Sequence, residues 1–249
     1  MKKIIKKIFA FFNIAIRSKS KLEKKLANSV SMSKWEHDIN FAIQIGSHLG
    51  PDFLKLMKLS KAQFRQDLFA LKELKIKKNG FFVEFGATDG VSGSNTFLLE
   101  KEFGYKGILA EPNPKQRKNI EKKRNAIIVE ECVWAKSGEN VNLTDDGDLS
   151  TVDLIKDNKF SFTVKTISLT DMLEKHNAPS LIDYLSIDTE GSEFDILSSH
   201  DFSKYNFSVI TVEHNYTEQR EKIHQLLSKN GYLRKYKELS MQDDWYVLT

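Results

Sequence analysis

The chain is poor in cysteine, in proline and in long hydrophobic runs. Its 249 residues include one cysteine, Cys132, and four prolines. A single cysteine excludes an intramolecular disulfide and a zinc site built on several cysteines, and it fits a reducing, cytoplasmic compartment. The apolar run Ile8–Ile16 has nine residues and is broken by Asn13, whereas a helix needs about 20 to span a bilayer. With 40% hydrophobic and 29% charged residues, the composition is that of a globular protein with its own core.

Most of the chain also lacks an excess of positive charge, although the formal net charge is +4. Residues 1–26 contain nine of the 38 Lys+Arg and one of the 34 Asp+Glu, which gives this segment a net charge of +8. The remaining residues carry 29 basic and 33 acidic side chains, a net charge of −4. An acidic main body offers no general excess of charge to neutralise phosphates, so we expect no nucleic-acid partner.

The N-terminal head, residues 1–30, is amphipathic between residues 2 and 17. On a helical wheel, apolar residues such as Ile8 and Phe12 share one face, and lysines such as Lys3 share the other. This pattern is typical of a helix that lies on an anionic membrane surface, here the inner face of the membrane. Docking on the protein's own core, disorder and a secretion signal are the alternatives, although no small-x-small cleavage site follows.

The rest of the chain divides into a helical lead-in and an α/β domain. Residues 31–78 form the lead-in, which ends at the turn signal Asn79–Gly80. In residues 79–249, short apolar strands alternate with helical segments, which predicts an α/β domain with a mostly parallel sheet. The predicted strands are Phe81–Phe85, Gly107–Glu111, Ala126–Val133, Phe160–Leu169, Leu181–Ile187, Phe207–Glu213, Tyr232–Glu238 and Trp245–Leu248. The predicted helices are Asn95–Phe103, Lys115–Arg124, Thr170–Glu174 and Thr217–Asn230, and Asp145–Asp148 is predicted to be an acidic turn.

The first predicted strand of this domain runs into a glycine-containing turn with the spacing Glu84-x-Gly86-x-x-x-Gly90. A strand that ends in such a turn and then opens a helix brings backbone N–H groups close to a ligand. The spacing differs from GxGxxG, which disfavours a dinucleotide phosphate site. A plain tight turn would explain the same residues.

An acid ends the second predicted strand. Glu111 lies 21 residues after Gly90 and is followed by Pro112. In a βαβ unit, an acid at this place accepts hydrogen bonds from the ribose hydroxyls of an adenosine-containing cofactor. A surface glutamate is the alternative, but an acid that ends a hydrophobic strand at this distance favours the cofactor role.

Two further strand ends carry candidate catalytic groups. Asp188 and Glu190 follow the strand Leu181–Ile187, at the end where open α/β sheets bind ligands. Acids also stabilise a helix N-terminus; Glu193 fits that role, whereas Asp188 lies too early. His214 ends the strand Phe207–Glu213, and a structural role for it is an equal alternative.

Several segments together resemble the FkbM-type S-adenosylmethionine-dependent methyltransferases. They are VEFGATDG, SNTFLLEK, ILAEPNP, LSIDTEGSEFDIL, VEHN and DDWYVL, and the resemblance covers roughly residues 60–249. It implies a class I methyltransferase (Rossmann-like) fold, with a mostly parallel seven-stranded sheet, helices on both faces and an antiparallel last strand. It also implies S-adenosylmethionine as cofactor and methylation of a hydroxyl on a saccharide, glycolipid or natural product. Many family members have Lys where this chain has Ser186.

The resemblance implies a role for particular residues of this chain. The cofactor's amino-acid part would be held by Glu84, Gly86 and Gly90, and its ribose by Glu111. The adenine would be flanked by Cys132 and Val133, and the methyl-transfer site would face Asp188 and Glu190.

A hydroxyl acceptor is a weak acid, so a base helps as its proton leaves, and Asp188 or His214 are the candidates. We predict no metal site; the alternative is a cation on Asp188 and Glu190 that polarises the hydroxyl. Trp134, Tyr216 and Trp245 could stack on a sugar ring or belong to the core. Two other functions remain open: a nicotinamide-dependent oxidoreductase, which the missing GxGxxG disfavours, and a catalytically silent scaffold, which the acids at three strand ends disfavour.

Overall fold

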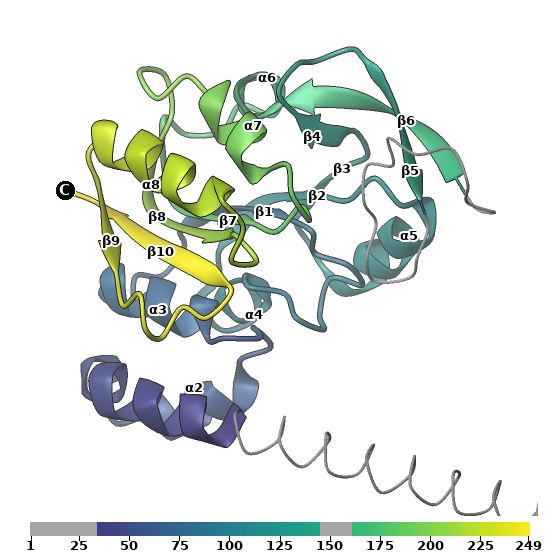
Figure 1. The fold of residues 1–249 in the computed structure, drawn as a ribbon. Helices are drawn as coiled ribbons and strands as arrows, with labels where there is room; N and C mark the ends of the chain where they lie inside the picture. The colour runs from purple at the N-terminus through teal and green to yellow at the C-terminus, as the bar shows by residue number, and fades with distance from the viewer. Residues whose placement is uncertain (1–33, 145–160) are drawn as a thin grey trace, which may run out of the picture. The chain divides into compact units, whose positions relative to one another are not determined.

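The computed structural model describes residues 34–144 and 161–249 (Figure 1). The chain divides into two compact units, Met1–Gly46 and Ser47–Thr249. The basic head and the predicted acidic turn Asp145–Asp148 lie outside the described residues. In the first unit a helix covers residues 34–45. Among the described residues, no helix is both long and apolar enough to cross a membrane.

The second unit is built on a seven-stranded sheet with the order β3-β2-β1-β7-β8-β10-β9. Strands β3, β2, β1, β7 and β8 run parallel, and β10 runs antiparallel to both β8 and β9. The predicted α/β fold with a mostly parallel sheet is therefore confirmed. The strands of this sheet are β1 (Phe81–Phe85), β2 (Lys106–Ala110), β3 (Ile127–Val129), β7 (Leu181–Ile187), β8 (Asn206–Glu213), β9 (Tyr232–Lys235) and β10 (Asp243–Leu248).

Helices lie on both faces of this sheet, with α3 and α4 on one side and α7 and α8 on the other (Figure 1). Phe69 of α3 stacks on Trp245 of β10 with 4.7 Å between ring centres, so the end of the helical lead-in covers one face. The helices and helical turns are η1 (Gly46–Leu49), α2 (Phe53–Leu59), α3 (Gln66–Glu73), α4 (Phe97–Phe103), α5 (Pro114–Lys123), α6 (Leu169–Lys175), α7 (Glu193–Ser198) and α8 (Gln219–Lys229).

The central strands are buried because they are covered on both faces. In β7, every residue after Leu181 is buried, and β1 is buried from Phe82 onward. This is why these strands appear in the sequence as continuous apolar runs instead of alternating patterns. A charged side chain within such a run is therefore costly unless it is paired or protonated.

The predicted strand Ala126–Val133 is wrong as a single element. It is two strands, β3 and β4 (Cys132–Trp134), and the latter belongs to a second sheet with the order β4-β6-β5. The exposed Glu130 interrupts the apolar run, and the chain leaves the main sheet there. The predicted strand Phe160–Leu169 corresponds to β6 (Ser161–Ser168), which pairs with β4 and with β5 (Asn140–Thr144) instead of joining the main sheet.

Candidate active site

A cavity lies where the order of the main sheet reverses. β1 pairs with β2 on one side and with β7 on the other, so the crossover connections leave in opposite directions and open a crevice at the carboxyl ends. Six of the nine residues that the sequence singled out line this cavity: Gly86, Glu111, Cys132, Val133, Asp188 and Glu190. Other lining residues include Thr88, Gln116, Leu143 and Ser192.

Gly86, the residue after β1, lies against the backbone of Asp188, the residue after β7. Its φ angle is +77°, and a Cβ atom built there would lie 2.0 Å from the carbonyl oxygen of Asp188. Real Cβ atoms do not approach backbone so closely, so glycine is required here for two reasons, its conformation and the lack of space. The glycine brings the turn after β1 against the loop that carries Asp188.

Glu111 follows β2 and is only 5% exposed. Its Oε1 atom accepts a hydrogen bond from the backbone N–H of Asn113 at 2.8 Å. Burial raises the pKa of its carboxyl to about 7, although the Asn113 bond and the charge of Arg117 act in the opposite direction. A ligand that offers hydroxyl donors would stabilise the ionised form, and a ribose diol does so.

Cys132 and Val133 of β4 form an apolar wall of the cavity. Both are buried, and burial, together with the nearby Glu111 charge, raises the pKa of the Cys132 thiol to about 11. The thiol therefore stays protonated near neutral pH and acts as a small apolar group. Leu143 of β5 adds a second apolar surface. A flat, uncharged ring such as adenine fits this lining.

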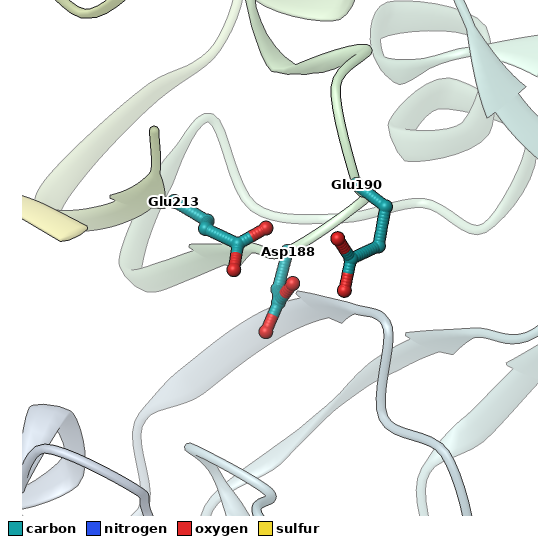
Figure 2. A group of neighbouring side chains, drawn as sticks. All are labelled: Asp188, Glu190 and Glu213. Atoms are coloured by element: carbon teal, nitrogen blue, oxygen red, sulfur yellow. The ribbon is translucent and has the colours of Figure 1, made fainter. Parts of the chain in front are cut away.

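Three carboxylates lie close together where β7 and β8 end, and two of them, Asp188 and Glu190, line the cavity. Asp188 and Glu190 follow β7, and Glu213 is the last residue of β8; each offers an oxygen within 4.8 Å of the other two (Figure 2). Glu213 was not among the site residues predicted from the sequence. The sequence shows that Glu213 is an acid at the end of an apolar strand. It does not show that Glu213 lies near Asp188, because this proximity depends on the pairing of β7 with β8. Among the residues that the structure describes, these three are close enough together to hold a cation.

The carboxyl groups of Asp188 and Glu213 share a hydrogen bond, and their pKa values are moved upward. Burial raises the pKa of Asp188 to about 6, with a further contribution from Glu190 and Glu193. Burial and the Asp188 charge raise the pKa of Glu213 to about 9. Near neutral pH the pair therefore holds one proton, mainly on Glu213, and Asp188 is ionised. The buried Oε2 atom of Glu213 has no hydrogen-bond partner.

His214 does not line the cavity, although it is next to Glu213 in the chain. Its Nε2–H donates to the carbonyl oxygen of Asp243 at 2.9 Å, and its Nδ1 accepts from the backbone N–H of Tyr216 at 2.9 Å. Burial lowers the pKa of the imidazole, so it stays neutral in this tautomer. Both ring nitrogens are engaged with backbone, and the contacts of His214 are those of a residue that holds a turn.

Glu84 and Gly90 also do not line the cavity. Glu84 is 2% exposed and accepts hydrogen bonds from the Ser94 hydroxyl at 2.9 Å and from the backbone N–H of Asn95 at 2.7 Å. The Asn95 side chain in turn donates to the Ser186 hydroxyl at 2.9 Å. These hydrogen bonds join the segment between β1 and α4 to β1 and β7, and so hold this segment in place.

The aromatic residues considered as sugar-stacking groups do not line the cavity either. Trp245 is fully buried against Phe69, so it belongs to the core. Tyr216 is 63% exposed, and its ring lies 5.4 Å from that of His214.

The fold and the site together define the class of protein. A parallel sheet with a switch-point cavity, a glycine turn after β1, an acid after β2 and an acid after β7 are the features expected of a class I methyltransferase. The methyltransferase FkbM domain matches residues 84–234, which is more than half of the chain. The chain therefore belongs to the FkbM methyltransferase family, and this membership implies the use of S-adenosylmethionine.

Solved structures of several methyltransferases are similar to the chain in part. A precorrin-6y C5,15-methyltransferase from Geobacter metallireducens GS-15 has 16% identity and a TM-score of 0.41, with 73% of this chain and 85% of that chain covered. A ribosomal protein L11 methylase from Lactobacillus delbrueckii subsp. bulgaricus has 11% identity and a TM-score of 0.40, with 74% and 76% covered. A methyltransferase from Pyrococcus furiosus has 15% identity and a TM-score of 0.37, with 72% and 78% covered. No curated protein matches the sequence.

Proposed function

We propose that this protein transfers a methyl group from S-adenosylmethionine to a hydroxyl of a saccharide, glycolipid or natural product. The observation that carries the proposal is the switch-point cavity, which Gly86, Glu111 and Asp188 line together. A nicotinamide-dependent oxidoreductase does not fit the family to which the chain belongs. Polysaccharide modification in the cell envelope is the context in which we propose to search for the acceptor.

The residues of the cavity divide the work of cofactor binding. Glu111 would receive the ribose hydroxyls, and Cys132 and Val133, which also line the cavity, would contact the adenine. Gly86 leaves room for the amino-acid part next to the backbone of the turn. When bound, S-adenosylmethionine supplies an electrophilic methyl group on a positively charged sulfur. The cavity's remaining task is to hold the acceptor oxygen in line with that methyl group.

Asp188 is the base that we propose for the acceptor. As the acceptor oxygen bonds to the methyl carbon, its proton passes to the ionised Asp188 carboxylate, and the carbon–sulfur electron pair stays on sulfur. A pKa of about 6 keeps Asp188 mostly ionised at neutral pH and still basic enough to take the proton. Glu213 already carries the proton of the pair, so Asp188 is the free acceptor.

The charge near Asp188 also restricts the acceptor. The charges of Glu190 and Glu193 lie close enough to Asp188 to raise its pKa. A phosphate or carboxylate placed next to the reacting oxygen would be repelled by these groups. We therefore propose an acceptor that is neutral at the reacting position.

Two measurements test this function. Purified protein should bind S-adenosylmethionine in a calorimetric titration, and Glu111→Ala should abolish binding, whereas the exposed Leu233→Ala should not. The second measurement incubates the protein with radiolabelled S-adenosylmethionine and cell-envelope extracts. Identification of the labelled product then gives the acceptor. Binding without transfer to any extract would favour the silent scaffold. Unchanged affinity of the Glu111→Ala variant would refute the ribose assignment.

A cation on the three carboxylates is the second candidate for activating the hydroxyl, because their oxygens lie within 4.8 Å of one another. The two candidates make different predictions. Activity that survives exhaustive chelation supports Asp188 as the base, and activity that is lost on chelation and restored by Mg²⁺ supports the cation.

We also propose that the protein lies on an anionic membrane surface. The +8 charge of residues 1–26 supports this, and so does an apolar ridge on helix 34–45. Trp35, Ile39 and Ile43 recur every four residues and are 68%, 53% and 74% exposed. Interfacial helices combine such apolar residues with nearby basic charge.

Sedimentation with vesicles tests the membrane proposal. Binding to phosphatidylglycerol-containing vesicles should fall when residues 1–26 are removed, and it should fall in the Ile39→Ser, Ile43→Ser double variant. Leu233→Ser, at a residue that is 53% exposed on β9, is the matched control and should bind as the parent does. Equal binding of all four proteins would refute the proposal.

A further inference from the structure

A fully enclosed arginine lies directly behind the turn that follows β1. Arg124 is the residue after α5, and its side chain has no exposed surface. Arginine is rarely buried completely unless its donors are paired. Its guanidinium also lies 5.5 Å from the ring centre of Phe82 and 5.6 Å from that of Phe97. Two aromatic rings therefore fix the guanidinium by cation–π contacts, in addition to its hydrogen bonds.

The donors of Arg124 point at the segment between β1 and α4 and at α4 itself. One nitrogen donates to the carbonyl oxygen of Gly90 at 2.8 Å and to the Ser94 hydroxyl at 3.0 Å. The second donates to the Thr96 hydroxyl at 2.8 Å, and the third to Glu100 at 2.9 Å. One side chain thus ties the glycine turn, the loop after it and helix α4 to the end of helix α5.

Ser94 and Thr96 stand between Arg124 and Glu84. Each hydroxyl accepts a hydrogen bond from Arg124 and donates one to Glu84, so two hydroxyls bridge an ion pair whose charged atoms are 3.9 Å apart. The bridge satisfies the buried carboxylate and the buried guanidinium at once. Gly90 completes the arrangement, because a Cβ atom there would lie 3.2 Å from the Arg124 side chain.

The elements that this network joins both contribute residues to the lining of the cavity. The turn after β1 contributes Gly86 and Thr88, and α5 with the residues before it contributes Pro112 and Gln116. Neither Arg124 nor Glu84 lines the cavity. The network can therefore affect a ligand only through the spacing and rigidity of the walls that contact it.

We propose that Arg124 is a positioning residue for the cofactor, which sets the distance between the turn after β1 and helix α5 through the Glu84–Ser94–Thr96 bridge. This inference depends on the proposed use of S-adenosylmethionine. It also explains how Glu84 and Gly90 contribute to the site without contacting the cavity. Both residues act through the arginine behind the turn.

The experiment compares a buried serine with an exposed serine of the same loop. Ser94→Ala removes one bridging hydroxyl without leaving an unpaired charge, and Ser92→Ala removes a hydroxyl that is exposed and 3.4 Å from Asp89. We expect Ser94→Ala to weaken S-adenosylmethionine binding about fivefold, which corresponds to the typical net free energy of one hydrogen bond. Ser92→Ala should change the affinity less than twofold. In turnover assays, the KM for S-adenosylmethionine should rise in Ser94→Ala while kcat and the acceptor KM stay the same.

Arg124→Lys is the stronger variant, because lysine cannot reproduce the fork that reaches four acceptors. It should weaken binding about tenfold or more by the same reasoning, since several hydrogen bonds are lost. Arg234→Lys controls for stability: Arg234 pairs with the buried Asp244 at 3.0 Å and does not line the cavity. It should lower the melting temperature without changing the affinity.

The outcomes separate this inference from the function on which it depends. If the parent protein does not bind S-adenosylmethionine, the proposed function fails. If the parent binds it and both Ser94→Ala and Arg124→Lys keep the parent affinity, the positioning role is refuted while the function stands. An equal loss of affinity in Arg234→Lys would show a general effect of stability, and would also refute the positioning role.

Discussion

Replacing Glu213 by glutamine should make the protein more stable at alkaline pH. In the folded protein, burial and the Asp188 charge raise the pKa of Glu213 from 4.5 to about 9. The folded state therefore keeps a proton that the unfolded state releases between these two values. Stability falls as the pH rises through this window, because the unfolded state binds fewer protons. Glutamine replaces the O–H donor of the protonated carboxyl with an amide N–H donor toward Asp188 and removes the titration.

The size of the effect follows from the shift. Each pH unit above 4.5 costs about 1.4 kcal/mol for a fully buried group. Glu213 is only partly buried and is coupled to Asp188, so solvent screening reduces the difference at pH 8 to about 1–2 kcal/mol. Urea unfolding of both proteins at pH 6, 7, 8 and 9 measures it. The parent should lose stability faster with rising pH than the variant. Parallel pH profiles would refute the proton-sharing pair.

Three further substitutions test the site. Asp188→Asn should abolish methyl transfer and keep S-adenosylmethionine affinity within about threefold, since it removes the base and keeps the shape; turnover within tenfold of the parent would exclude Asp188 as the base. Gly86→Ala should prevent binding or folding, because its Cβ would lie 2.0 Å from the Asp188 carbonyl, and normal binding by calorimetry would contradict this. His214→Gln should lower the melting temperature by several degrees, because a hydrogen bond to the Asp243 carbonyl is lost. The acid limb of the pH profile of kcat/KM should stay near pH 6, the pKa of Asp188. A shift of this limb in the variant would show that His214 takes part in the reaction.

The sequence could predict those parts of the site that depend on one strand and its own end. Gly86, Glu111 and Asp188 each follow a buried apolar run, and parallel strands bring their carboxyl ends to one edge of the sheet. The cavity lies at that edge. The continuous apolar runs of β1 and β7 reflect burial on both faces, so both strands could be predicted within a residue or two.

The parts that depend on pairing between distant segments could not be predicted. Glu213 faces Asp188 because β8 is the neighbour of β7, and His214 is held by a carbonyl of β10. No hydrophobic pattern in the sequence predicts that β8 lies next to β7 or that His214 contacts β10. The break between β3 and β4 could not be predicted either. It falls at Glu130 and Glu131, and no glycine or proline marks it within the β-rich run.

The contact between Gly86 and the Asp188 carbonyl has a consequence for engineering this enzyme. Because no Cβ atom fits between Gly86 and the Asp188 carbonyl, a library that varies Gly86 will mostly yield misfolded protein. Acceptor preference is better altered at other residues that line the cavity, such as Thr88, Gln116 and Ser192. Every such variant then keeps the close contact between Gly86 and the Asp188 carbonyl, and with it the position of Asp188.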